Sequence, residues 1–209
     1  MLSAQALRVL GVLIEKELST PDYYPMTVNG IVNGCNQKSN RSPVVDFGEI
    51  TVIKALDELY SLRLSGHASV AGSRSEKYRH AASQHWELDQ AGLSILASLV
   101  LRGPQTVGEL RAHTSRMFSF ENMDAVVDVL DSLAEREEPL VARAGKASGQ
   151  KGIRFAHLLA GTPEIEEDSA GAEETESSSN AAQADELQEL RERLDSLESA
   201  FEAFRKQFD

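Results

Sequence analysis

NGCNQKSNRSPVVDFGEI, residues 33–50, places a row of polar side chains between two helical patterns. The row consists of Asn36, Gln37, Lys38, Ser39, Asn40 and Arg41. Before it, Thr27 caps a short apolar pattern typical of a helix. After it, Asp46 at an N-cap and Glu49 three residues later have the spacing of a capping box. The stretch therefore predicts the long turn of a helix-turn-helix unit.

Patterns on either side complete this unit. Upstream, a helical period of apolar residues ends before Pro21 and Pro25, which cannot continue a helix. Its positions are Leu7, Leu10, Leu13, Ile14 and Leu18. The helix after the stretch ends near Gly66. Its predicted apolar face consists of Ile50, Ile53, Leu56, Leu59 and Tyr60. Two short strands, 67–71 and 76–81, follow, which gives three helices and a β-hairpin.

The same order recurs in the second half of the chain. A helical pattern over 89–102 ends at a Gly-Pro stop signal, and Thr106 with Glu109 forms another capping box. A third helix follows, and its predicted buried positions are Val126, Val127, Leu130 and Leu133. The segments LVARA and IRFAHLL then read as two strands.

Two alignments indicate that one unit has been duplicated. LDEL (56–59) aligns with LDSL (130–133), and KYRH (77–80) aligns with RFAH (154–157). Three helices followed by a β-hairpin are typical of a winged helix-turn-helix domain. We therefore expect a mainly α fold with small β-hairpins, an α+β class. The expected tandem winged helix-turn-helix domains cover residues 1–84 and 85–162.

The C-terminal quarter has two different compositions. Residues 163–184 contain seven acidic residues and no basic ones, which predicts a disordered acidic linker. In residues 185–209, large apolar residues recur at spacings of three and four, the pattern of a coiled-coil helix. These residues are Leu187, Leu190, Leu194, Leu197, Phe201, Phe204 and Phe208. We expect a homodimer through this amphipathic helix; the alternative is a helix that folds back on its own body.

The net charge of −12 is distributed unevenly. Residues 1–86 carry 9 basic and 8 acidic side chains, residues 87–163 carry 8 and 10, and residues 164–209 carry 4 and 15. The acidity therefore belongs to the tail, and the nearly neutral body does not exclude a polyanionic partner.

No membrane association and a cytoplasmic location are expected. Charged residues interrupt the longest apolar stretches before they reach the roughly 20 residues that a bilayer requires. The N-terminal pattern lacks the basic segment, apolar run and cleavage site of a signal peptide. The single cysteine, Cys35, cannot form an internal disulfide and fits a small buried residue.

Three segments resemble a known family. They are LIEKELSTPDYYPMTVNGIVNGCNQKSNRSPV, GSRSEKYRH and GQKGIRFAHLLAG. Together they are similar to the YceH-like family of bacterial proteins, over roughly residues 2–161. The resemblance implies a tandem winged-helix fold and a cytoplasmic bacterial protein, and it implies no biochemical activity.

An enzyme is not expected, and neither is a metal or another cofactor. The five histidines do not have the spacing of a metal-ligand set with one another or with Cys35. The glycine-rich segment GKASGQKG lacks the residue order of a phosphate-binding loop and precedes a strand rather than a helix.

Double-stranded DNA is one candidate partner, bound through backbone contacts of the first domain. The candidate contact residues are Asn36, Gln37, Lys38, Asn40, Arg41, Arg74, Lys77 and Arg79. In one alternative, the Asn and Ser side chains brace the long turn. In another, the protein is a protein–protein interaction or assembly scaffold, because the third helix of the second domain is strongly acidic and would repel phosphates.

Overall fold

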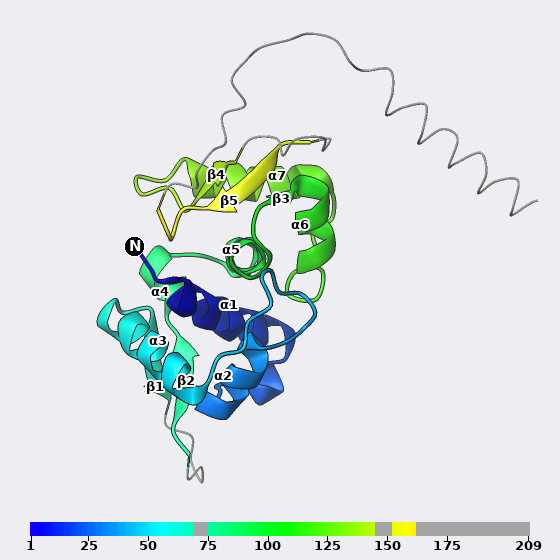
Figure 1. Ribbon diagram of the computed structural model, residues 1–209. Coiled ribbons are helices and arrows are strands. Elements are labelled where there is room, and N and C mark those ends of the chain that lie inside the picture. The colour runs from blue at the N-terminus through cyan, green and yellow to red at the C-terminus, as the bar shows by residue number, and fades with distance from the viewer. Residues whose placement is uncertain (69–74, 145–151, 162–209) are drawn as a thin grey trace, which may run out of the picture. The chain divides into compact units, whose positions relative to one another are not determined.

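The computed structural model describes residues 1–68, 75–144 and 152–161, which form α-helices and two small antiparallel sheets (Figure 1). The mixed α and β class is as predicted. The first half consists of α1 (Ala4–Ser19), the 3-10 helix η1 (Pro21–Tyr23), α2 (Val28–Cys35), α3 (Glu49–Ser61), β1 (Ser65–Ala68) and β2 (Lys77–His80). After the short α4 (Ala82–Trp86), the second half consists of α5 (Gln90–Arg102), β3 (Gln105–Thr106), α6 (Val107–Thr114), α7 (Met123–Ala134), β4 (Val141–Arg143) and β5 (Arg154–His157). The predicted acidic linker, the heptad helix and Arg74 lie outside the described residues.

Both halves use the same strand pairing. In the first half, β1 pairs antiparallel with β2, and Met26 joins them by donating to the Tyr78 carbonyl oxygen at 3.0 Å. In the second half, β4 and β3 both pair antiparallel with β5, and Gln105 lies opposite Phe155. In each half, the last strand therefore pairs with the preceding strand and with the residues just before the second helix.

Two of the three predicted helix caps are correct. The Thr27 hydroxyl accepts from the Gly30 N–H at 3.2 Å, and Thr106 with Glu109 forms a full capping box. The predicted cap at Asp46 is wrong, because α3 begins at Glu49 with Gly48 as its N-cap and without a side-chain cap. The side-chain amide of Asn36 binds both backbone polar groups of Phe47, at 2.9 and 2.8 Å. These bonds fix the backbone at Phe47 outside the helix, so α3 starts later than the sequence pattern suggests.

The core of the first half continues into α5. Leu93, Ala97 and Leu101 of α5 belong to the same buried cluster as the apolar face of α1, while Ile95 and Leu99 belong to the core of the second half. Figure 1 shows α5 between α1 and β5. The approach of α1 to α5 requires glycine at position 11, because a Cβ there would lie 2.9 Å from Leu101 Cγ. A central helix thus connects the two halves through apolar packing.

Only two of the five residues in the predicted apolar face of α3 are buried. Leu56 and Leu59 are buried, but Ile50, Ile53 and Tyr60 are 73%, 43% and 61% exposed. The helix instead turns Val52 and Ala55 inward with the two leucines. In α7, Val126, Leu130 and Leu133 are buried as predicted, and Val127 is half-buried. Within the described ranges, no helix has both the length and the apolar character that crossing a bilayer demands.

Candidate functional site

The polar row of residues 36–41 lies in the connection between α2 and α3, and this connection runs along the end of α5. The Ser42 N–H donates to the Leu101 carbonyl oxygen at 2.8 Å. The Arg102 guanidinium donates to Asn40 Oδ1 at 2.6 Å. The loop that the sequence suggested for contacts with a partner therefore also fastens the first half to α5.

Arg41 is an internal residue, which corrects the expectation that it is available to a phosphate. Its side chain has no exposed surface. The guanidinium donates to both carboxylate oxygens of Glu15, at 2.6 and 3.0 Å, and Nε donates to the Gly34 carbonyl oxygen at 3.1 Å. A bidentate pair of this kind leaves no free edge for another anion. Arg41 thus holds the loop against α1.

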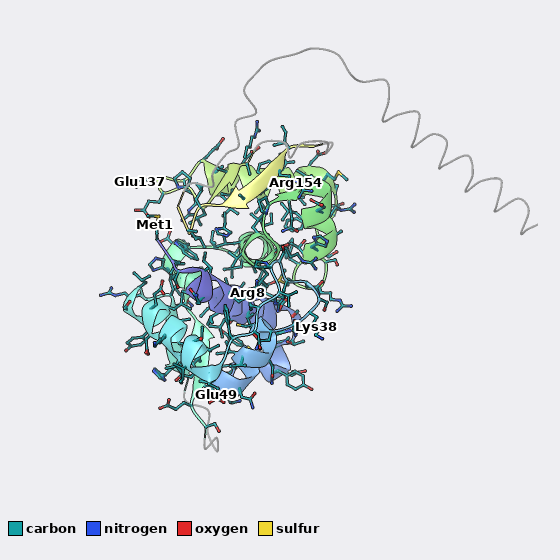
Figure 2. The ribbon with its side chains drawn as sticks, viewed as in Figure 1. Met1, Arg8, Lys38, Glu49, Glu137 and Arg154 are labelled. Atoms are coloured by element: carbon teal, nitrogen blue, oxygen red, sulfur yellow. The ribbon has the colours of Figure 1, made fainter. Side chains whose placement is uncertain are left out.

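Some of the other polar residues of the row make hydrogen bonds that stabilise the loop, and others face solvent. Asn36 binds Phe47, and Gln37 Oε1 accepts from Arg41 Nη2 at 2.9 Å. Arg8, which the sequence reasoning missed, is buried beneath the loop and donates to the Pro43 carbonyl oxygen at 2.5 Å. Burial, followed by the nearby charge of Arg41, lowers the pKa of Arg8. Figure 2 shows Arg8 inside the fold and Lys38 extending from its surface.

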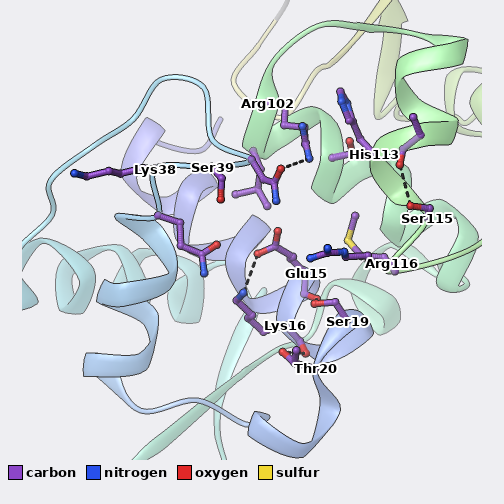
Figure 3. A pocket seen from close by; sticks show the side chains of 16 residues that line it. Glu15, Lys16, Ser19, Thr20, Lys38, Ser39, Arg102, His113, Ser115 and Arg116 are labelled. Carbon is purple, nitrogen blue, oxygen red and sulfur yellow. Dashed lines mark hydrogen bonds and ion pairs between the residues drawn. The ribbon is translucent and has the colours of Figure 1, made fainter. Parts of the chain in front are cut away.

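A pocket of about 860 Å³ lies where this loop meets α1, α5 and α6 (Figure 3). Four cationic side chains line it: Lys16, Lys38, Arg102 and Arg116. They come from α1, the loop, the end of α5 and the connection after α6. Hydroxyl groups of Ser19, Thr20, Ser39, Ser98 and Ser115 also lie in the lining residues. We call this set of residues the cationic pocket.

The cationic pocket contains a single carboxylate among its lining residues, that of Glu15. Both oxygens of that carboxylate are bound by Arg41, and Lys16 Nζ lies 3.5 Å from Oε2. Because the one negative charge is already compensated, the remaining cations give the pocket a net positive potential. A concave surface with this potential attracts anions.

His113 lies on the pocket wall beside Arg102. Its Nδ1 is 2.7 Å from Gln105 Oε1, and the Gln105 amide nitrogen donates to the Ser98 and Gly103 carbonyl oxygens. The amide oxygen of Gln105 is therefore the acceptor, and the neutral ring carries its proton on Nδ1. Burial, followed by the positive charge of Arg102, holds the pKa of His113 below its usual value, while Glu109 opposes the shift.

The predicted contact residues on β2 lie elsewhere. Arg79 is exposed and Lys77 is half-buried, and neither lines the cationic pocket. Gln37, Lys38 and Asn40 are the predicted residues that do line it. Sequence reasoning missed Lys16, Arg102, His113 and Arg116, since nothing in their local patterns indicates that segments about a hundred residues apart in the sequence meet.

The third helices expose different chemistry. On α3, Ile50, Ile53 and Tyr60 are exposed, and the Tyr60 ring lies 5.9 Å from the ring of His67 on β1. On α7, the exposed residues are Met123, Asp124, Asp128 and Ser132. The two helices therefore present different surfaces, with three large apolar side chains exposed on α3 and one on α7.

The described residues contain one cysteine and no cluster of potential metal ligands. Within residues 1–68, 75–144 and 152–161, no three His, Cys, Asp or Glu side chains are grouped so that they could hold a metal ion. Cys35 is fully buried, and burial raises the pKa of its thiol to about 12, which keeps it protonated and unreactive at neutral pH.

Comparison with known proteins identifies the family. Residues 2–150 match the family described as "Protein of unknown function, DUF480". A UPF0502 protein of Geobacter metallireducens is 50% identical over 168 residues, which cover 79% of this chain and 75% of that protein. A UPF0502 protein of Solibacter usitatus is 44% identical over 208 residues, which cover 100% of this chain and 98% of that protein. The resemblance noted from the sequence motifs is thereby confirmed at the level of the family, and the chain belongs to the DUF480/UPF0502 family of bacterial proteins.

Proposed function

We propose that this protein is a non-enzymatic, nucleic-acid-associated protein that binds phosphate backbone in the cationic pocket. The observation that carries the proposal is that Lys16, Arg102 and Arg116 line one pocket, with Lys38 at its rim, and that Arg41 engages the single carboxylate among its described lining residues. Backbone phosphates are bound mainly by such cationic donors, and this binding does not depend on base sequence.

In this proposal the two halves are tandem winged helix-turn-helix domains. The order of three helices and two antiparallel strands occurs twice, and the same additional strand pairing accompanies each copy. This repetition supports the assignment. The fold alone does not specify a partner, whereas the cationic groups of the pocket favour an anionic one.

The proposed binding mode differs from insertion of a third helix into a DNA groove. On α3, the exposed Ile50, Ile53 and Tyr60 would remove polar base edges and phosphates from water, and the two isoleucines offer them no hydrogen bonds in return. On α7, the exposed carboxylates of Asp124 and Asp128 would repel phosphates. Contact through the cationic pocket avoids both the desolvation at α3 and the charge repulsion at α7.

Equilibrium binding of a fluorescent DNA duplex to the full chain tests this mode. We expect binding at low salt that weakens strongly in Arg116→Glu, because the substitution reverses one pocket charge and disturbs no hydrogen bond in the described part of the chain. Lys54→Glu is the matched control, since Lys54 is an exposed cation on α3 outside the pocket.

The two variants separate the alternatives. Equal weakening in both would indicate that the outer face of α3 also lies on the DNA. Absence of any binding at low salt would overturn the proposal.

We also propose that the chain forms a homodimer through residues 185–209, which would double the number of pocket contacts with one nucleic acid. The support is the heptad spacing from Leu187 to Phe208 in the sequence. Sedimentation of the full chain should give a dimer, and Leu194→Asp should give a monomer. A monomer for both chains contradicts this part of the proposal.

A protein–protein interaction or assembly scaffold is the second candidate function. The specific observation in its favour is the exposed apolar row of Ile50, Ile53 and Tyr60 on α3, because such surfaces are typical of protein interfaces. A purified partner should then bind the full chain with an affinity that falls in Ile53→Glu and is unchanged in Arg116→Glu. The reverse pattern would exclude α3 as the docking helix.

A further inference from the structure

The cationic pocket has the size of a small-molecule site. Its volume of about 860 Å³ lies within the roughly 300–1,000 Å³ that such sites span. One phosphate group would occupy a small part of this space. Leu101, Met117 and several serine hydroxyls line the remainder. A ligand that fills the pocket therefore has an organic part beside its anionic group.

Several donors in the pocket have no partner in the described part of the chain. Arg116 makes no hydrogen bond or ion pair there, and Lys38 makes none either. Arg102 uses one Nη2 proton on Asn40 and retains the donors on Nε and Nη1. A guanidinium group presents several donors in one plane, which matches the geometry of phosphate oxygens.

The pocket wall is contributed by both halves of the fold. Lys16 and Lys38 belong to the first half, and Arg102 and Arg116 belong to the second (Figure 3). Figure 3 shows Arg116 reaching toward Glu15 across the pocket. A ligand that bridges these side chains would stabilise the folded chain, because it binds the native state and not the unfolded one.

We infer that the cationic pocket binds a small phosphorylated molecule with a hydroxyl-bearing organic part, whose phosphate is held by Arg102, Arg116 and Lys16. This inference goes beyond the proposed function, because it requires no polymer. The two proposals share a pocket, so the small ligand competes with phosphate backbone.

His113 reports whether the pocket is occupied. The charged groups around it are Arg102 on α5, Glu109 on its own helix, and Lys16, Arg116 and Glu15 across the pocket. A phosphate bound against Arg102 offsets the positive charge that disfavours protonation of the ring. The pKa of His113 therefore rises when the ligand binds.

Calorimetric titration of the full chain with ribose 5-phosphate tests the inference, with ribose as the matched neutral ligand. We expect saturable binding of ribose 5-phosphate, at least a tenfold weaker affinity in Arg116→Gln, and unchanged affinity in Lys54→Gln. Nuclear magnetic resonance of the histidine side chains should show the pKa of His113 rising on binding. Ribose should not bind.

The inference is overturned if ribose 5-phosphate gives no saturable binding at about 10 mM, ten times a millimolar Kd. It is also overturned if Arg116→Gln binds as well as the unaltered chain. DNA binding that ribose 5-phosphate does not displace removes this inference and leaves the proposed function. Ribose 5-phosphate binding without DNA binding removes the proposed function and leaves this inference.

Discussion

The third helices of the two halves have the same buried pattern and different exposed residues. With the 74-residue offset that aligns LDEL with LDSL, the buried residues Val52, Leu56 and Leu59 correspond to the buried residues Val126, Leu130 and Leu133. The exposed residues differ: Ile50 corresponds to Asp124, and Lys54 corresponds to Asp128. The repeated unit is therefore defined by its core, while each copy presents its own surface.

The connection before the third helix differs even more. In the first half it carries Arg41 into the interior, where the guanidinium joins α1 to the loop through Glu15. In the second half the connection after α6 carries Arg116, which is exposed and lines the cationic pocket. Two arginines near one another in the fold thus have different roles, one in stability and one in the candidate site.

Substitution of these two arginines should produce the largest contrast. Arg41→Met leaves the carboxylate of Glu15 without its bidentate partner in a mostly buried place, so the free energy of unfolding should fall by about 3 kcal/mol. Arg116→Met removes an exposed side chain and should change it by less than about 0.5 kcal/mol. Urea denaturation measures both values. Similar losses would contradict the division into a structural and a pocket arginine.

Glycines in the second helices of the two halves should respond with opposite signs. Gly34→Ala places a Cβ 2.6 Å from Val12 Cγ1 and should destabilise the fold by about 1–3 kcal/mol. Gly108→Ala places its Cβ 3.7 Å from Met123 Cε, an ordinary contact, and should stabilise α6 by about 0.5–1 kcal/mol. Thermal unfolding of the two variants checks the signs. A gain from Gly34→Ala would mean that α1 and α2 pack less closely than described.

The strand histidine His157 should make the stability of the fold depend on pH. Its buried Nδ1 has no hydrogen-bond partner among the described residues, whereas Nε2 of the aligned His80 lies against the Glu17 carboxylate. Burial lowers the pKa of His157 in the folded state, so its contribution to stability is present above the unfolded pKa of about 6.5 and is lost as the pH falls below it.

Urea denaturation at about pH 7.5 and about pH 5 tests this pH dependence of stability, because histidine changes its charge within that range. The unaltered chain should lose stability on acidification, and His157→Gln should lose less. The exposed His85→Gln serves as the control and should behave like the unaltered chain. An unchanged pH dependence in His157→Gln would assign the acid sensitivity to other groups.

The smallest effect is expected from exchanging an exposed residue of α3 for its counterpart in α7. Ile50→Asp copies Asp124 onto a side chain that is 73% exposed, near the start of the helix where a negative charge is favourable. The free energy of unfolding should change by less than about 0.5 kcal/mol, as measured by urea denaturation. A loss well above this value would show that Ile50 contributes to a core after all.

Local patterns predicted the elements of the fold well. The cap at Thr27 and the capping box of Thr106 with Glu109 depend on residues within one helical turn, and both are correct. The cap at Asp46 failed because Asn36, ten residues earlier in the sequence, fixes the backbone of Phe47. The exposure of Ile50 and Ile53 was missed because apolar residues on α3 occupy two faces, and periodicity alone does not choose between them.

The candidate site was much less predictable. Lys38 was predicted as a contact residue because it is a cation in the polar row, and it lines the pocket. Arg41 was predicted on the same grounds but is buried against Glu15. Arg102 and Arg116 belong to the other half of the chain, and only the packing of α1 against α5 brings them to the loop. A site assembled from distant segments leaves no spacing in the sequence from which to infer it.

The salt dependence of DNA binding is the sharpest test of phosphate binding in the cationic pocket. For the full chain, the logarithm of the binding constant should fall with the logarithm of salt concentration by about 0.9 for each phosphate contact. Replacing Arg116 with Gln should reduce that slope by about one contact, and Lys54→Gln should leave it unchanged. A slope that is the same in the unaltered chain and in Arg116→Gln would contradict phosphate binding in the cationic pocket.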